Sequence, residues 1–425
     1  MINGELKIIS KNKKFFLSVI TGNILEYYDI GLYLYLLPKL TVVFFPKNDP
    51  QTEMLVGLMV FAAGFVMRPL GGILFGHIGD RYGRKKMLIL SISLSAIPAF
   101  VIGCLPSFDT IGMSAYVILI LCRVAHGVCV GGESAAILVY ILEKTQKKKE
   151  NFIGSVIGSI ATIGVIIGGL CSMLSLHHSA PSWGWRVPFL LSIILGLYGG
   201  YYRYHLQESK AFQLIKKTPR PPPLIEVFKK NKKSMLCVFG VAIAASIPIH
   251  LMTVYVSFIM INFMDVKTSK AIFFNMIILL SQAAILPLCG ILADKIGNPR
   301  LMKVGLISMT VAAYPVFYMI SLKSLGWVIG GQLLLIAVYS LFQCGIGAFN
   351  MHRFPVPTRA TGIGFAFNLG NSLIGSTAPL VVTFFSAEAA YPIIPTIYIF
   401  IGAAIGWFSI WLSENDRYYK ISSSK

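Results

Sequence analysis

The amino-acid sequence predicts an all-α membrane protein whose twelve transmembrane helices form two six-helix bundles. Three observations support this fold class. The chain of 425 residues is 56% hydrophobic and only 13% charged, about half the charged fraction of a typical soluble domain. Apolar runs of about 20 residues, enough to cross a hydrocarbon core about 30 Å thick, recur along its whole length. A motif that contains Asp80 returns around Asp294, about half a chain later.

The predicted spans fall into two groups of six. They cover residues 15–45, 54–78, 87–106, 112–142, 152–176, 187–206, 235–262, 270–293, 301–321, 325–349, 360–386 and 391–413. Between the sixth and the seventh lies a basic segment with four prolines, 205–234, which is too polar to cross a bilayer. We therefore expect an N-terminal bundle (1–206), a cytoplasmic linker (207–233) and a C-terminal bundle (234–425), as in transporters built from two repeated halves.

The net charge of +20 follows this topology. With the N-terminus inside, the cytoplasmic loops and span ends hold 29 of the 37 lysines and arginines, the exterior ones hold six, and Arg68 and Arg123 lie within spans. This is the positive-inside pattern, and it places both termini in the cytoplasm. The lipid bilayer accounts for the charge, so no nucleic acid is expected as a partner. The first apolar run contains Glu26 and Asp29 and lacks a small-residue cleavage site, which predicts a retained helix.

The repeated motif lies in the loops after the second and eighth spans. It reads GHIGDRYGRKK at 76–86, with Asp80, and GILADKIGNPR at 290–300, with Asp294. Gly76 permits close approach of another helix, and Gly83 permits a tight turn. Asp80 can pair with an arginine at the cytoplasmic mouth.

The first loop resembles the cytoplasmic signature G-x-x-x-D-R-x-G-R-K-K of the major facilitator superfamily. In that family the loop latches the two halves together when the protein opens outward. The resemblance implies a cytoplasmic gate made of Gly76, Asp80, Arg81, Gly83, Arg84 and Asp294. For the basic residues the positive-inside rule is an equally good explanation. The second copy has Asn298-Pro299-Arg300 in place of the basic pair, so we expect its latch to be weaker.

Further segments resemble one branch of that superfamily, the metabolite:proton symporters, which include proline/betaine, citrate, 2-oxoglutarate and shikimate carriers. These segments are GNILEYYDIGLYLY (22–35), FAAGFVMRPLGGILFGHIGDRYGRKK (61–86), RVAHGVCVGGESAA (123–136), GWRVPFLLS (184–192) and RFPVPTRATGIGFAFNLGNSLIGSTAPL (353–380). Three departures predict altered coupling or gating. His126 replaces the usual glutamine, His352-Arg353 replaces an acidic residue, and the usual Arg-Gly entry to the fifth span is missing at 149–154.

The first span carries two carboxylates on one helical face. Asn23, Glu26, Asp29 and Tyr33 lie within roughly 120° of each other at 100° per residue. A charge at the bilayer centre costs at least about 2.5–3.5 kcal/mol, so such groups are usually functional or paired. Two carboxylates facing one cavity can hold a proton between them. Alternatively, one of them is a structural partner of Arg123 or Arg68.

The fourth span carries Arg123, His126 and Glu133 on one face. We expect Arg123 to be the sole arginine deep in the first bundle, where it either binds a solute carboxylate as a bidentate fork or neutralises a neighbouring carboxylate. His126 is either a titrating group or a packing residue. Arg68, beside a proline, is expected to be structural and near the cytoplasmic side.

The second bundle carries neutral polar stripes. They include His250 and Thr253 on the seventh span, Gln282 on the eighth, and Asn368 and Asn371 on the eleventh. Such stripes suit a cavity wall that hydrogen-bonds a small polar solute. They suit packing between helices equally well, since small and polar residues are common at such contacts.

No enzyme motif is recognisable in the sequence. It has no G-x-x-x-x-G-K-[ST] and no His/Cys cluster with metal-ligand spacing, so we expect neither a cofactor nor a metal. The seven cysteines all lie in predicted spans without a CxxC pair, as packing residues do. Transport by such a protein must be driven by a gradient.

These features predict a secondary active transporter in a bacterial inner membrane. It would import a small polar organic solute with protons by alternating access, a zwitterion such as proline or betaine rather than a mono-, di- or tricarboxylate, with no obligate protein partner. One alternative is an efflux antiporter of the same fold, with a more aromatic cavity. Another is a transport-inactive sensor or scaffold that uses the basic, proline-rich linker as its contact surface.

Overall fold

The computed structural model describes residues 13–46, 50–177, 180–215, 221–375, 377–385 and 392–415. Over these residues the chain is helical and contains no strand. All twelve predicted spans are present as helices, which confirms the all-α fold class. Within the described ranges, eight helices are long and apolar enough to cross a membrane. The other four spans are α2, the α3–α4 pair, α9 and the α18–α19 pair.

The N-terminal half contains spans 1–6. These are α2 (Lys13–Phe44), α3 (Pro50–Val66) with α4 (Arg68–Tyr82), α5 (Arg84–Cys104), α7 (Met113–Leu142), α8 (Glu150–Ser175) and α9 (Arg186–Tyr204). The short α6 (Phe108–Ile111) and the 3-10 turn η1 (Lys147–Lys149) precede α7 and α8. The linker contributes α10 (Lys210–Ile215) and α11 (Pro223–Lys230).

The C-terminal half contains spans 7–12. Span 7 is α12 (Lys232–His250), the π turn η2 (Leu251–Tyr255) and α13 (Val256–Phe263). Spans 8–10 are α14 (Thr268–Ile296), α15 (Asn298–Ser321) and α16 (Leu325–Gln343), the last followed by α17 (Ile346–Met351). Span 11 is α18 (Arg359–Gly370), the π turn η4 (Asn371–Gly375) and α19 (Ala378–Phe385), preceded by the 3-10 turn η3 (Val356–Thr358). Span 12 is α20 (Ile393–Glu414).

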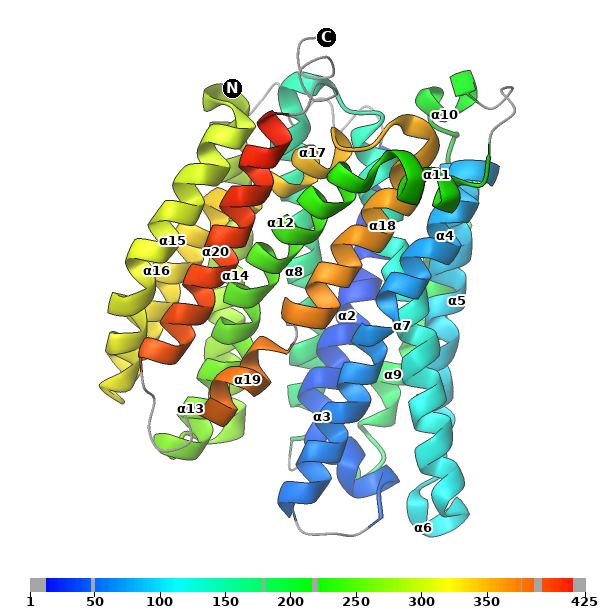
Figure 1. The fold of residues 1–425 in the computed structure, drawn as a ribbon. Coiled ribbons are helices and arrows are strands. Elements are labelled where there is room, and N and C mark those ends of the chain that lie inside the picture. The colour runs from blue at the N-terminus through cyan, green and yellow to red at the C-terminus, as the bar shows by residue number, and fades with distance from the viewer. Residues whose placement is uncertain are drawn as a thin grey trace.

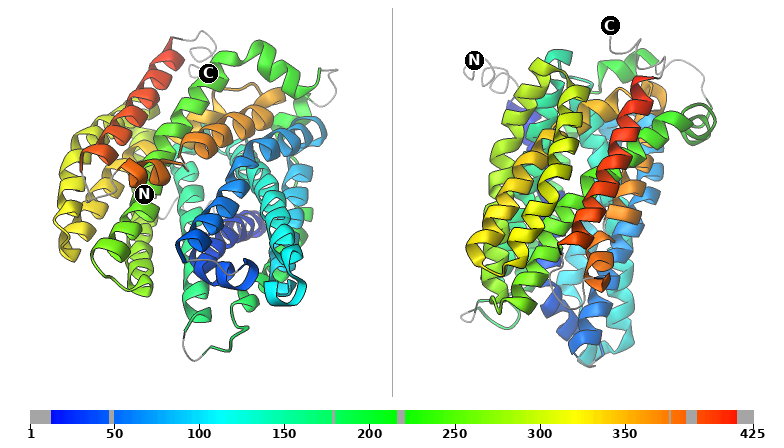
Figure 2. Two further views of the ribbon diagram at one scale, coloured as in Figure 1. Left: turned by 60° about the horizontal axis from the view of Figure 1, so that its bottom comes forward. Right: turned by 60° about the vertical axis from the view of Figure 1, so that its left-hand side comes forward.

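The two halves stand side by side, and their ribbons converge at the end that carries the linker (Figure 1). Two helix pairs join them, α8 with α14 and α4 with α18. At the opposite end the ribbons of α3 and α13 lie apart, as the turned views also show (Figure 2). Each half has its own buried apolar core, while large apolar side chains such as Leu197, Val311 and Trp411 are exposed on the outside. An exposed apolar surface of this kind suits contact with lipid chains.

Three helices are interrupted at mid-length. Span 2 breaks at Met67, where Pro69 follows in the first turn of α4 and lacks an N–H for the helical ladder. Span 7 has its π turn three residues after Pro248, and span 11 has one at Asn371–Gly375. π turns inside α-helices occur frequently at functional sites. The breaks therefore draw attention to the region where spans 2, 7 and 11 approach each other.

Candidate functional site

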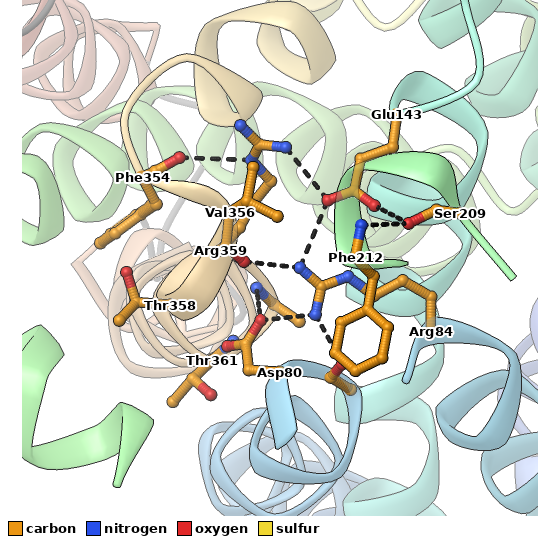
Figure 3. A network of polar contacts seen from close by, with 12 residues as sticks. Asp80, Arg84, Glu143, Ser209, Phe212, Phe354, Val356, Thr358, Arg359 and Thr361 are labelled. Atoms are coloured by element: carbon orange, nitrogen blue, oxygen red, sulfur yellow. Dashed lines mark hydrogen bonds and ion pairs between the residues drawn. The ribbon is translucent and has the colours of Figure 1, made fainter. Parts of the chain in front are cut away.

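Asp80 links the two halves at the predicted cytoplasmic end. Its carboxylate accepts hydrogen bonds from the backbone N–H groups of Ala360 (3.1 Å) and Thr361 (2.8 Å), in the first turn of α18 (Figure 3). A carboxylate at a helix N-terminus compensates both the unpaired N–H groups and the positive end of the helix dipole. The same carboxylate forms an ion pair with Arg84 at 2.7 Å. Asp80 is 1% exposed, so these contacts are shielded from water.

Arg84 extends this contact into a network across both halves. Its guanidinium donates to the carbonyl oxygen of Val356 (2.6 Å), the first residue of η3, and pairs with Glu143 at 3.3 Å. Glu143 in turn pairs with Arg359 of the C-terminal half at 3.0 Å. The linker joins in, because Ser209 Oγ donates to Glu143 at 2.5 Å (Figure 3). We call Asp80, Arg84, Glu143, Ser209 and Arg359 the Asp80 network.

Sequence reasoning missed three members of this network, Glu143, Ser209 and Arg359. Glu143 carried a usable signal, since it is an acidic residue at the start of the basic loop EKTQKKK. Arg81, by contrast, is exposed, and no contact between it and the network is seen among the described residues. Of these two motif arginines, Arg84 is therefore the one that joins the halves.

Two glycines of the motif are explained by their backbone positions. A Cβ at Gly76 would lie 2.5 Å from Thr361 Cα and 2.8 Å from its backbone nitrogen, so only glycine lets α4 and α18 approach this closely. Gly83 has φ +116°, a conformation that side chains disfavour. It turns the chain sharply between α4 and α5 and so places Arg84 next to Asp80.

Asp294 occupies the equivalent position on the other side of the repeat. Its carboxylate accepts from the backbone N–H groups of Asn151 (3.1 Å) and Phe152 (3.0 Å) in the first turn of α8. The Asn151 side-chain amide donates a third hydrogen bond at 2.9 Å. Asp294 thus has an amide as its side-chain partner, whereas Asp80 has the Arg84 guanidinium. Both copies of the motif thus cap the first turn of a helix in the opposite half.

The two departures from the family pattern at 149–154 and 352–353 face each other. His352 Nε2 lies 2.7 Å from Glu150 Oε2, and the pair joins α8 to the C-terminal half beside the Asp294 contact. The contact therefore joins an imidazole of the C-terminal half to a carboxylate of the N-terminal half.

A second fully buried charged pair of the N-terminal half is Glu133 with Arg203. The two side chains form an ion pair, Ser91 Oγ donates to the same carboxylate, and Arg203 also donates to the carbonyl of Leu88 at 2.8 Å. Glu133 is 1% and Arg203 0% exposed. The expectation that Arg123 is the sole deep arginine of this bundle is therefore wrong. The Arg203 side chain extends from the end of α9 into the bundle, where it contacts Glu133 and the Leu88 carbonyl.

Glu26 lies in the middle of the bundle. Ser134 Oγ donates to its Oε1 at 2.6 Å, whereas Oε2 is buried with no hydrogen-bond partner among the described residues. Arg68 lies within electrostatic range of this carboxylate. Its guanidinium stacks over the Phe65 ring at 3.7 Å.

Arg68 is not near the predicted cytoplasmic side, which corrects the expectation from its sequence context. It begins α4, fourteen residues before Tyr82 at the end of that helix. At 1.5 Å per residue the distance is about 21 Å, so Arg68 lies in the middle of the membrane.

A third charged group lies further toward the predicted exterior. Ser192 Oγ donates to Asp29 at 2.6 Å, and His126 Nε2 lies 3.6 Å from the same carboxylate. The Arg123 guanidinium stacks over the Tyr33 ring at 3.8 Å. These five residues come from α2, α7 and α9, and each is under 5% exposed.

The predicted cavity-lining residues divide between packing and partly exposed positions. Asn23 donates to Ile157 at 2.8 Å, Gln282 to Gln343 at 2.7 Å, and Asn368 to Gly131 at 2.8 Å, so these three amides tie helices together. Tyr33 is covered by Arg123. His250, Thr253 and Asn371 are half-buried, and all three lie in or next to the π turns of spans 7 and 11.

Comparisons with known proteins agree with this architecture. The family model described as Major Facilitator Superfamily matches residues 19–379. The chain is 30% identical over 422 residues to the proline/betaine transporter of Salmonella typhimurium, covering 95% of this chain and 84% of that protein. It is 31% identical over 402 residues to the glycine betaine/proline/ectoine/pipecolic acid transporter OusA of Dickeya dadantii, covering 91% and 80%.

Solved structures show the same fold at low sequence identity. The proton:xylose symporter XylE superimposes with a TM-score of 0.72 at 16% identity, covering 95% of each chain. The human organic anion transporter MFSD10 superimposes with a TM-score of 0.68 at 15% identity, covering 94% of this chain and 99% of its own.

Proposed function

The chain belongs to the major facilitator superfamily, and from that premise we propose that it is a proton-coupled symporter of small zwitterionic solutes such as proline and glycine betaine. It works by alternating access in a bacterial inner membrane, with both termini in the cytoplasm. The names of the matched relatives support the solute class, and the positive-inside pattern supports the orientation. The observation that carries the coupling is the arrangement of buried charges in the N-terminal half.

Glu26, Asp29 and Glu133 are buried carboxylates of this half, and they are not equivalent. Glu133 contacts Arg203 directly and is committed to it. Asp29 accepts a hydrogen bond from Ser192 with one oxygen, and its other oxygen lies 3.6 Å from His126 Nε2, without a hydrogen-bond partner among the described residues. Glu26 has one oxygen satisfied by Ser134 and one without a hydrogen-bond partner among the described residues. Among the described residues Asp29 and Glu133 each have a basic partner, whereas Glu26 forms no ion pair. Glu26 is therefore the least stabilised of the three as an anion, and it is the group that takes up the proton.

Proton entry supplies the driving force, because each elementary charge moved across 100 mV releases about 2.3 kcal/mol. The Asp80 and Asp294 contacts hold the predicted cytoplasmic end closed. Release of solute to the cytoplasm requires both helix caps to open, while the opposite end closes. The linker belongs to this machinery, since Ser209 contacts Glu143 and the Phe212 ring lies 5.5 Å from the Arg84 guanidinium. These contacts favour a transport role for the linker over a docking surface.

Uptake into proteoliposomes tests this function. An inward proton gradient is imposed, and labelled proline, glycine betaine and citrate are offered separately. We expect accumulation of the two zwitterions, abolished by a protonophore. Accumulation of citrate alone would contradict the solute class, and gradient-driven extrusion would favour the efflux alternative.

Replacing Gly76 with valine is expected to lower the initial uptake rate more than tenfold. The new side chain meets Thr361 backbone atoms, which cannot move aside, so the cytoplasmic end is held apart. The distance between spin labels on exposed Lys86 and Lys295 should lengthen in double electron–electron resonance. Gly326→Val is the control, because a Cβ there has nothing within 4 Å. Normal uptake by Gly76→Val with an unchanged label distance would show that the close approach is dispensable.

Reversing the Glu150–His352 pair tests whether the two departures compensate each other. Glu150→Lys alone places two basic groups opposite each other and is expected to lower the uptake rate about fivefold, the equivalent of about 1 kcal/mol for a partly exposed pair. Glu150→Lys with His352→Glu restores an attractive contact and should recover most of the rate. A double variant no better than the single one would mean that the two residues act independently.

A further inference from the structure

Arg68 differs from the other buried arginines in the groups that its guanidinium contacts. Arg84 and Arg203 each contact a carboxylate directly, and Arg353 donates to the carbonyl of Ser413. Arg68 is only 8% exposed. Within the described part of the chain it nevertheless forms no ion pair, and its Nε has no hydrogen-bond partner. Its guanidinium lies over the Phe65 ring.

The position of Arg68 is at the meeting of the two halves. Phe65 and Arg68 are three residues apart and share one side of span 2. The Phe65 ring lies edge-on to the His250 ring of span 7, with centroids 6.0 Å apart, and α3 also contacts the π turn η4 of span 11. Arg68 therefore stands in mid-membrane where three interrupted helices converge, which is the level at which solute sites form between such halves.

A guanidinium without a carboxylate in direct contact is costly at this depth, and an anionic ligand would offset the cost. A carboxylate matches the planar fork of an arginine in bidentate geometry. Arg123 is less suited to this task, since it is covered by Tyr33 between spans 1 and 4, inside a single half. Glu26 is the carboxylate within electrostatic range of Arg68.

We propose that Arg68, rather than Arg123, binds the carboxylate of the transported solute and thereby selects solutes that carry one. The proposal rests on the proposed function and names the anchor of its solute site. It also connects the movement of solute with that of protons. A solute carboxylate bound to Arg68 replaces Glu26 as the counter-charge of the guanidinium, and this favours protonation of Glu26.

Measuring the binding of glycine betaine and of choline to purified protein in nanodiscs tests this assignment. Both ligands carry a trimethylammonium group, but choline has an alcohol where glycine betaine has a carboxylate. Wild-type protein should bind glycine betaine about 10- to 100-fold more tightly than choline, as expected for a charge-assisted contact. Arg68→Gln should abolish that difference by weakening glycine betaine alone. Arg68→Lys, which keeps the charge and loses the fork, should be intermediate, and Arg123→Gln should preserve the ratio.

The possible outcomes separate the two proposals. Thermal unfolding identifies any variant that fails to fold, and Arg68→Lys then carries the test. If glycine betaine is bound and Arg68→Gln keeps the wild-type ratio, the assignment of Arg68 is overturned and the proposed function stands. A loss of the ratio in Arg123→Gln instead would move the anchor to that residue. If wild-type protein binds neither glycine betaine nor proline, the proposed solute class fails and the anchor with it.

Discussion

Replacing Arg203 with glutamine is expected to destabilise the protein by about 3–5 kcal/mol, because the change leaves the Glu133 carboxylate buried without its partner. Both side chains are at most 1% exposed, so water cannot compensate. The midpoint of unfolding in detergent should fall accordingly. The double variant Arg203→Gln/Glu133→Gln should recover more than half of the loss, since it removes the uncompensated charge.

Arg81→Gln is the matched control for this experiment, because Arg81 is exposed and surface substitutions usually stay within about 0.5 kcal/mol. If Arg203→Gln unfolds at the wild-type midpoint, Glu133 must already be neutral in the folded protein. Glu133 would then replace Glu26 as the candidate for the transported proton.

Replacing Glu26 with glutamine is expected to abolish gradient-driven accumulation while leaving solute exchange intact. The amide keeps the shape of the protonated acid and can still accept the Ser134 hydrogen bond, but it cannot take up or release a proton. Exchange of internal for external solute needs no net proton movement. Uptake with a proton gradient and counterflow without one therefore separate the two activities.

Glu26→Gln should accumulate at least tenfold less solute than wild type, because it loses about 2.3 kcal/mol of driving force per proton at 100 mV. Its counterflow rate should stay within about twofold of wild type. Ser192→Ala, which removes a hydrogen bond from Asp29, is the matched change at the neighbouring carboxylate and should retain accumulation. If Glu26→Gln still concentrates solute and Ser192→Ala does not, the proton is carried at Asp29.

The spans and the repeat were predictable because their signals are local. Long apolar runs and the charge bias of the loops gave all twelve helices, and the two copies of the glycine and aspartate motif gave the equivalence of Asp80 and Asp294. The structure adds what each aspartate does, which is to cap α18 or α8 in the opposite half. A motif indicates the capping residue but not the helix that it caps.

Pairing between distant segments was not predictable in the same way. Helical periodicity placed Arg123, His126 and Glu133 on one face, but it carries no information about neighbouring helices. Arg203, near the end of the sixth predicted span, has the sequence context of a basic residue of the cytoplasmic side. A long arginine side chain reaches several ångströms along its helix, and here it ends on Glu133.

The interruptions of spans 2, 7 and 11 were also not predicted from the sequence. A π turn adds one residue to a turn without a change in apolar character, so a hydropathy pattern passes over it. Pro248 and Pro69 were visible signals of weakened helices. Their significance depends on the tertiary arrangement, which brings Phe65 beside His250.

The central claim is that solute and proton cross together through Glu26, and solute-induced proton movement tests it most directly. Proline or glycine betaine is added to lightly buffered proteoliposomes with no imposed gradient, and the external pH is recorded. We predict alkalinisation of the medium by wild-type protein, none by Glu26→Gln, and normal counterflow by both. A solute that enters without any change in external pH, or an equal pH change in the Glu26→Gln variant, would contradict the account.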